Sequence, residues 1–331
     1  MMLIAVLLPA MGTAMDGVPP TFRFAGEGLA GDGSYIFSME PEFGCPQGFV
    51  GGNARRSLQM DRYVLVPLVL RYGFLPDWEV YSVLPYYWGS SPQEFTNYAT
   101  IGDPVTIRQT LKGQDFGDID TLIKWRVWES DEKDSAFLVH MGGSFPTGTD
   151  PWENVMYNYV TGPDTPRISF GDGAFELMGA AQWSYEGGSA ALDALAGASW
   201  RMPLEATAME PYGSKINVEP SSLLVGRVRG TWRGGESSWW LAGILEGYWS
   251  TAGRVTATGY LAKEPGSLSR VIDSYANLVK ASAGLWGGVG AGWQFSQAVS
   301  LGAEVKAPLV VGDSYRYWRS GLIFSYGAKV L

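Results

Sequence analysis

The sequence is short of cysteine, histidine and charge. It has 1 cysteine and 1 histidine in 331 residues, and a formal net charge of −9. Charged residues make up 17% of the chain, against about 25% in an average soluble protein. A single cysteine excludes an intramolecular disulfide framework, and so few thiol and imidazole groups argue against a dedicated zinc site. The acidic balance argues against a nucleic-acid partner, which normally needs a basic surface. We therefore expect no metal and no other cofactor.

Long apolar runs are missing beyond the first residues. Residues 1–11 are apolar and Gly12-Thr13-Ala14 offers small residues for cleavage, so residues 1–14 are predicted to form a signal peptide. Nothing later reaches the ~18 consecutive apolar residues that a membrane-spanning helix needs. Glycine and tryptophan are abundant instead, at 44 and 14 residues. A membrane protein without spanning helices must be a closed β-barrel, because lipid cannot satisfy an open sheet edge.

Alternation of apolar and polar residues supports the barrel. In residues 117–128, Ile119, Ile123 and Trp125 share one face, whereas Lys124 and Arg126 share the other. This period of two residues predicts a strand with one apolar side and one charged side. The same pattern recurs in strands of the length that a tilted membrane crossing requires.

The connections between these strands alternate between short and long. Turns rich in Gly, Asp or Ser are expected at 74–77, 129–134, 187–188, 234–236 and 296–297, and long loops at 41–61, 90–116, 146–170, 203–217 and 251–278. Such alternation is typical of periplasmic turns and extracellular loops, whereas a secreted soluble β-sandwich has no reason to show it. We predict an all-β, transmembrane, antiparallel up-and-down β-barrel of about twelve strands, within roughly ten to fourteen. Residues 15–331 would form its single domain, with 15–33 as a lead-in segment that either enters the lumen or precedes the wall.

Three groups of residues carry a resemblance to a known family. The first group is Pro67, Leu70-Arg71-Tyr72-Gly73, Trp78-Glu79-Val80 and Leu84-Pro85; the second is Phe116-Gly117-Asp118-Ile119-Asp120 with Lys124-Trp125-Arg126; the third is Ser144-Phe145-Pro146-Thr147-Gly148. In this order they resemble the "MetA-pathway of phenol degradation" family of outer-membrane transporters, over roughly Arg62 to Tyr185. The resemblance implies a barrel that passes small hydrophobic or aromatic molecules.

A second resemblance lies near the C-terminus. Residues Ser320 to Tyr326 are similar to the signal through which barrel proteins engage the barrel-insertion machinery, although the chain continues to Leu331. We therefore expect that machinery as a partner, along with the lipid bilayer of the bacterial outer membrane.

The charged faces of the strands are expected to converge in the lumen. Both signs are abundant, and unpaired charges are costly in a dry interior, so these groups must pair or meet water. One interpretation is a polar pathway, in which an arginine ladder faces acidic residues across a constriction; the other is a salt-bridged plug. The candidate lumen or constriction residues are Arg71, Glu79, Asp118, Asp120, Lys124, Arg126, His140, Glu176, Arg227, Arg229, Arg233, Glu246, Glu304 and Lys306, and Arg227, Arg229 and Arg233 would form the ladder.

An enzyme is the alternative from a different class. The chain resembles outer-membrane phospholipases in strand count, and its only histidine, His140, has Ser144 and Asn154 in the following sequence. Four strand residues separate His140 from Ser144 by roughly 13 Å, too far for a base to activate a nucleophile. Asp118 and Asp120 lie beside Lys124 and Arg126 and are better suited as counter-ions than as an acid/base pair. We expect no catalytic activity.

The predicted function is passive or facilitated passage of small, hydrophobic or aromatic solutes. Two alternatives stay open: a general small-solute porin, and a sealed structural or adhesive barrel. Loop aromatics Trp152, Tyr157 and Tyr159 would form either a ligand vestibule or ordinary loop packing.

Overall fold

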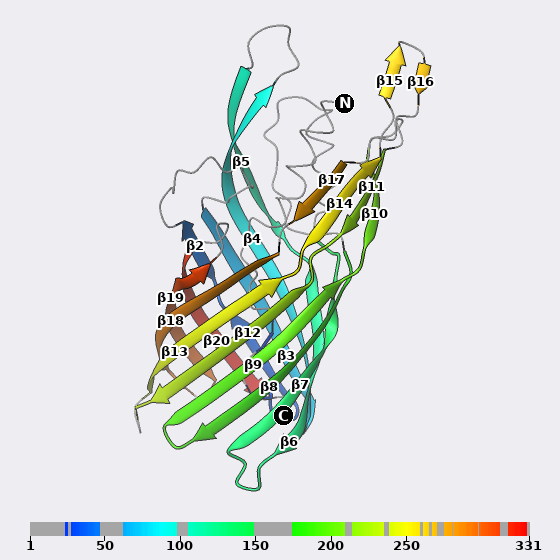
Figure 1. The fold of residues 1–331 in the computed structure, drawn as a ribbon. Coiled ribbons are helices and arrows are strands. Elements are labelled where there is room, and N and C mark those ends of the chain that lie inside the picture. Colours follow the sequence, from blue (N-terminus) through cyan, green and yellow to red (C-terminus); the bar gives the residue numbers. More distant parts are fainter. Residues whose placement is uncertain are drawn as a thin grey trace.

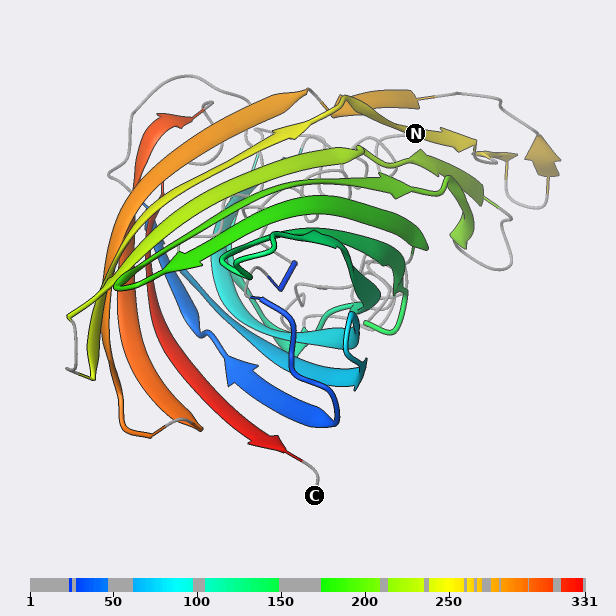
Figure 2. The same cartoon turned by 90° about the horizontal axis from the view of Figure 1, so that it is seen from below.

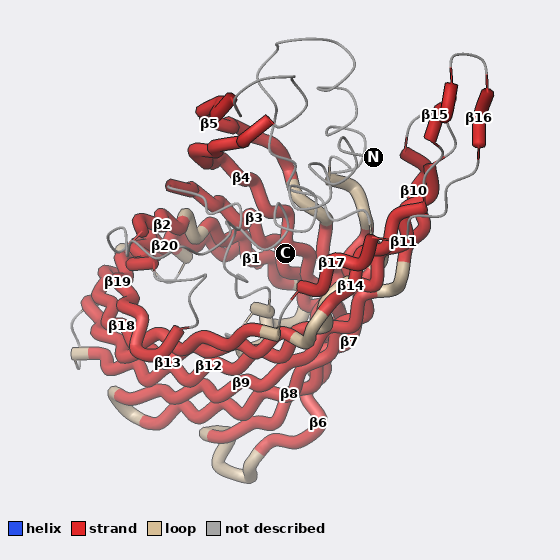
Figure 3. Tube along the Cα trace, turned by 45° about the horizontal axis from the view of Figure 1, so that its top comes forward, coloured by secondary structure: helices blue, strands red, loops and turns tan. Residues whose placement is uncertain are grey.

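Every regular element that the structure describes is a strand (Figure 3). The computed structural model describes residues 24–25, 28–46, 62–97, 105–148, 174–208, 214–234, 238–258, 261–264, 267–269, 275–279, 281–296, 298–311 and 317–329. No helix in these ranges is long and apolar enough to cross a membrane. The predicted signal peptide at 1–14 lies outside the described residues.

The main sheet closes on itself because the first strand pairs with the last (Figures 1 and 2). All of its pairings are antiparallel, and within the described residues they make a barrel wall of 12 strands. β1 and β2 share one wall position, because both pair with β3 and β20. β5 and β6 share another, because both pair with β4. The wall consists of β1 (Ser34–Met39), β2 (Glu42–Pro46), β3 (Arg62–Leu75), β4 (Trp78–Asn97), β5 (Val105–Phe116), β6 (Ile119–Glu129), β7 (Ser135–Phe145), β8 (Glu176–Gly187), β9 (Ala190–Arg201), β12 (Leu223–Arg233), β13 (Trp239–Ser250), β18 (Ser282–Gln294), β19 (Val299–Val311) and β20 (Tyr317–Lys329).

Side chains divide between the two faces of the wall as the alternation predicts. On β7, Phe137, Met141 and Phe145 are exposed on the outside, whereas Leu138 and His140 are buried on the inside. The exposed set around the barrel is dominated by Leu, Val, Phe and Trp, which suits a surface that faces lipid. The predicted fold class is confirmed.

The strands continue beyond the barrel on the side of the long connections. A four-stranded sheet prolongs four wall strands after breaks of two or three residues (Figure 1). It consists of β10 (Leu204–Ala208), β11 (Ser214–Glu219), β14 (Gly253–Thr258) and β17 (Tyr275–Val279), and a hairpin of β15 (Leu261–Glu264) and β16 (Ser267–Ser269) follows β14.

These extensions correct the prediction of long loops at 90–116, 203–217 and 251–278. Most of residues 90–116 belongs to β4 and β5, which pair from Tyr86 with Phe116 to Asn97 with Val105. Apolar and polar residues alternate in the extensions too, as in Leu204–Ala208, Ser214–Glu219 and Gly253–Thr258, but these strands have only 5 or 6 residues each. Because a membrane-crossing strand needs about 9–11 residues, such short runs do not stand out from loops in the sequence, although their backbones pair as a sheet.

Candidate functional site in the barrel lumen

A buried ion-pair cluster lies on the inner face of β3, β4 and β6. Arg71 on β3 donates from Nε to Glu79 Oε1 and from Nη2 to Glu79 Oε2 on β4, both at 2.8 Å. Lys124 on β6 stands directly opposite Glu79 in the strand register and is fully buried, as is Asp120 on the same strand. The inward parity of three adjacent strands therefore brings Arg71, Glu79 and Lys124 together, and the bidentate geometry makes the Arg71–Glu79 pair a strong one.

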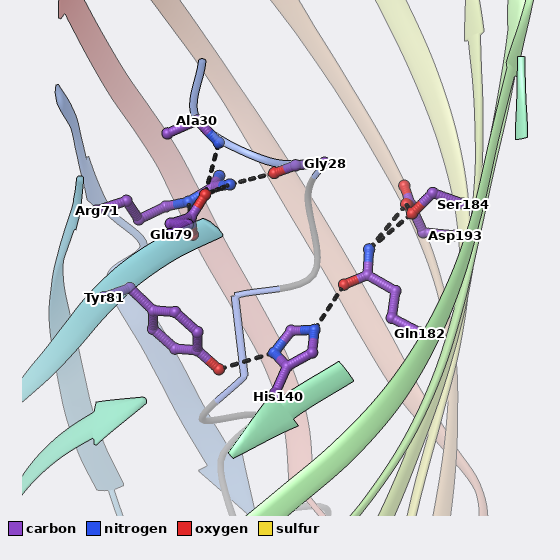
Figure 4. Close-up of polar contacts among 9 residues, drawn as sticks. All are labelled: Gly28, Ala30, Arg71, Glu79, Tyr81, His140, Gln182, Ser184 and Asp193. Atoms are coloured by element: carbon purple, nitrogen blue, oxygen red, sulfur yellow. Dashed lines mark hydrogen bonds and ion pairs between the residues drawn. The ribbon is translucent and has the colours of Figure 1, made fainter. Parts of the chain in front are cut away.

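His140 on β7 links this cluster to the next strands (Figure 4). Its Nδ1 lies 2.9 Å from the Tyr81 hydroxyl and its Nε2 lies 3.0 Å from Gln182 Oε1. Because a carboxamide oxygen only accepts, Nε2 carries the proton and Nδ1 accepts from Tyr81. The Gln182 amide then donates to Ser184 Oγ, at 2.8 Å, and to Asp193. His140 is thus occupied by Tyr81 and Gln182 rather than by Ser144.

Part of the lead-in segment lies inside the barrel against this cluster (Figures 2 and 4). The Ala30 amide donates to Glu79 Oε2 at 2.5 Å, and the Gly28 carbonyl accepts from Arg71 Nη2. Phe24 is 5% exposed and packs in an apolar cluster on the inner face of the wall. The residues of that cluster are Tyr81, Val83, Leu122, Met178 and Leu195.

A second charged cluster occupies another arc of the inner wall. Arg319 on β20 donates from Nη1 to Glu246 and from Nε to Glu42, each at 2.7 Å. Lys306 on β19 donates to the other oxygen of Glu246 at 2.9 Å. The Arg319 guanidinium also lies over the ring of Trp286, 5.3 Å from its centroid. Glu246 is 4% and Arg319 1% exposed, so these charges neutralise one another out of contact with bulk water.

Arg229 extends this cluster through an aromatic side chain. It pairs with Glu304 at 3.0 Å and lies over the ring of Trp240, 5.4 Å from its centroid. Trp240 itself rests on glycines of the neighbouring strands: a Cβ added at Gly292 or Gly302 would come within 2.3 or 2.4 Å of its ring. The glycines therefore create the space that positions Trp240 under Arg229.

The three arginines of the predicted ladder do not act as one set. Arg229 reaches Glu304, whereas Arg233 pairs with Glu186 at the turn end of the barrel, where both side chains are at least half exposed. Arg227 is half-buried on the same strand. The alternation along a strand fixes the face on which a side chain lies. The partner of that side chain depends on which other strands of the curved wall bring a charged group near it.

Other predicted residues lie away from both clusters. Arg126 pairs with Asp77 and Glu129 near a turn, Glu176 lies 3.5 Å from Arg201, and Asp118 accepts from the Gly148 amide at 2.9 Å, just before β6 begins. The candidate vestibule lies outside the described residues; it consists of Trp152, Tyr157 and Tyr159.

Several aromatic residues of the inner face are absent from the predicted lumen residues, which are charged side chains and His140. Trp240 and Trp286 share their strand faces with Glu246 and with inward glycines, so strand parity alone was a sufficient signal for them. Phe24 had no such signal, because it belongs to no strand. Among the described residues, no group of three or more His, Cys, Asp or Glu side chains is arranged to hold a metal ion.

Comparison with known proteins finds solved structures with a similar fold, although it finds no related sequence. No family model matches the chain, and no curated protein sequence matches it. A crystal structure of an outer-membrane channel from Pseudomonas putida F1 superimposes with a TM-score of 0.59 at 13% identity, covering 93% of this chain and 100% of that one. The chain therefore has the fold of an outer-membrane β-barrel.

Two further solved structures resemble the barrel more loosely. The toluene transporter TodX of P. putida matches with a TM-score of 0.43 at 11% identity, over 96% of this chain and 97% of that one. The toluene transporter TbuX of Ralstonia pickettii matches with a TM-score of 0.44 at 10% identity, over 97% of this chain and 98% of that one. At such identities the likeness concerns the fold alone, so the function of the barrel rests on its own lumen.

Proposed function

We propose that the barrel passes small, uncharged hydrophobic or aromatic molecules across the outer membrane. The observation that carries this proposal is the separation of charged clusters from an apolar cluster on the inner face of the wall. The ionised side chains of the two clusters pair with one another and are almost fully buried, whereas an apolar cluster that includes aromatic rings lies beside them.

This arrangement favours a neutral solute over an ion. A permeating ion is stabilised by charged or polar groups that can face it, and those of Arg71, Glu79, Glu246 and Arg319 are directed at each other. A neutral aromatic molecule needs only apolar contact, which the inner face offers around Phe24. The resemblance of Arg62 to Tyr185 to the "MetA-pathway of phenol degradation" family supports the same solute class, and nothing in the arrangement of His140 favours catalysis.

Salt conductance in a planar bilayer separates this function from that of a general small-solute porin. The purified, refolded barrel is expected to show no steady conductance of the size that an open aqueous pore gives. Folding is checked beforehand by the shift in gel mobility between heated and unheated samples. A large, steady, ohmic conductance from the verified barrel would contradict the proposal and favour the general porin.

A further inference from the structure

The phenyl ring of Phe24 packs into an apolar site on the inner face of the barrel wall, which we call the seat. Four strands line this seat, with Tyr81 and Val83 on β4, Leu122 on β6, Met178 on β8 and Leu195 on β9. All of them are at most 6% exposed. Phe24 is not part of any strand, so its ring contacts these wall residues without belonging to the wall itself.

The floor of the seat is a glycine. A Cβ added at Gly197 on β9 would lie 2.7 Å from Phe24 Cε2 and 2.9 Å from Cζ, closer than Cβ atoms approach other heavy atoms in proteins. The neighbouring inward positions of the same strand, Leu195 and Ser199, carry side chains that are buried. Gly197 therefore has no side chain at the inward position where the Phe24 ring lies against β9.

One edge of the seat is aromatic and has fixed orientation. The rings of Phe24 and His140 meet edge to face, with centroids 6.0 Å apart and an interplanar angle of 78°, an arrangement that aromatic pairs prefer. The hydrogen bonds of His140 to Tyr81 and Gln182 hold its ring in place. Met178 adds a side chain that adapts to irregular shapes.

We propose that this seat is a binding site for a neutral monoaromatic molecule, which takes the place of the Phe24 ring. This inference rests on the proposed function and adds a position and a ligand class to it. Gly197, Met178 and the edge of His140 would contact the bound ring. A charged aromatic such as benzoate is disfavoured, because its carboxylate would lose water and would compete with Glu79, which already pairs with Arg71 and lies opposite Lys124.

The lead-in segment is also anchored beyond Phe24. The contacts of Ala30 with Glu79, of Gly28 with Arg71, and of the Gly33 amide with the Gly73 carbonyl at 2.8 Å lie at residues 28–33. Exchange of the Phe24 ring for a solute leaves these three contacts in place, whereas the contact of the Ala25 backbone with the Tyr81 hydroxyl lies at the seat itself.

The test is toluene binding to the full-length barrel in detergent, measured by calorimetric titration. Phe24→Ala empties the seat, and dry apolar cavities of this kind bind benzene-sized ligands. We expect this variant to bind toluene saturably and at least ten-fold more tightly than the wild type. Phe137→Ala, on the lipid face of β7, is the control for toluene that dissolves in the micelle, and it should match the wild type.

A second variant tests whether toluene binds in the space that Phe24→Ala leaves and not elsewhere in the barrel. Phe24→Ala combined with Gly197→Leu refills the seat and should return toluene binding to the wild-type level, while benzoate should not bind to any variant. The proposal is overturned if Phe24→Ala binds toluene no more tightly than Phe137→Ala, or if the double variant binds as well as Phe24→Ala. Gel mobility verifies the fold of each variant.

The binding result and the proposed function fail separately. If cells that carry the wild-type barrel took up toluene but the Phe24→Ala barrel bound no toluene saturably, this inference would be overturned and the proposed function would stand. Saturable binding that the Gly197→Leu change abolishes would support the site even where cells took up no toluene, and the function would then be wrong.

Discussion

At the scale of single residues, the lumen is organised by cations that each hold more than one partner. Arg319 joins Glu42 on β2 to Glu246 on β13 and stacks on Trp286. Removing one member of a buried ion-pair network leaves the others charged and unpaired, which costs more than the network gained by forming. The stability of the barrel should therefore depend on such residues much more than on ion pairs at its turns.

Arg319→Met tests this dependence. The substitution keeps much of the side-chain volume but leaves Glu42 and Glu246 without the guanidinium, so we expect a loss of about 3–5 kcal/mol in the free energy of unfolding. Arg233→Met is the matched control, because its partner Glu186 is exposed, and it should cost less than about 1 kcal/mol. Urea unfolding in lipid vesicles measures both; equal losses would contradict the account.

At the scale of strands, glycines on β18 and β19 matter for the space that they leave. Trp240 from β13 lies across Gly292 and Gly302, and Arg229 from β12 lies over the Trp240 ring. Four neighbouring strands thus meet in one stack, which a side chain at either glycine would push apart.

Gly302→Val should destabilise the barrel by about 1–3 kcal/mol, as overpacking of a tight site does. Its Cβ would collide with the Trp240 ring. Gly243→Val on β13 is the control: it makes the same change of residue type in a strand, but a Cβ there meets nothing within 4 Å. Unfolding followed by tryptophan fluorescence compares the two, and a Gly302→Val barrel as stable as Gly243→Val would refute the role of the stack.

The strands that cross the membrane could be predicted from the sequence, and their partners in the lumen could not. Lipid on one side forces an apolar residue at every second position, as at Phe137, Val139 and Met141, so period and face are both visible in the chain. The extensions β10, β11, β14 and β17 have only 5 or 6 residues each, so any alternation in them is too short to indicate a membrane strand. The position of Phe24 had no local signal either, because it depends on a pocket made by residues from Tyr81 to Gly197.

At the scale of the whole molecule, the barrel closes where β1 pairs with β20, from Ser34 opposite Lys329 to Met39 opposite Phe324. Closure removes the sheet edges that lipid could not satisfy and turns the inner faces of the wall into a lumen of its own chemistry. The predicted contact of Ser320 to Tyr326 with the insertion machinery concerns this closing strand and stays a prediction. The lumen combines charges that pair with one another and an apolar seat, which together favour neutral solutes.

Uptake of labelled toluene by intact Gram-negative cells tests this central claim most directly, because the lipopolysaccharide leaflet slows hydrocarbon entry that a simple phospholipid bilayer would allow. Cells that carry the folded barrel in the outer membrane are expected to take up toluene several-fold faster than cells that lack it, and to take up benzoate at an unchanged rate. Equal toluene rates in the two strains, with the barrel verified in the outer membrane, would contradict the account and leave a sealed structural or adhesive barrel.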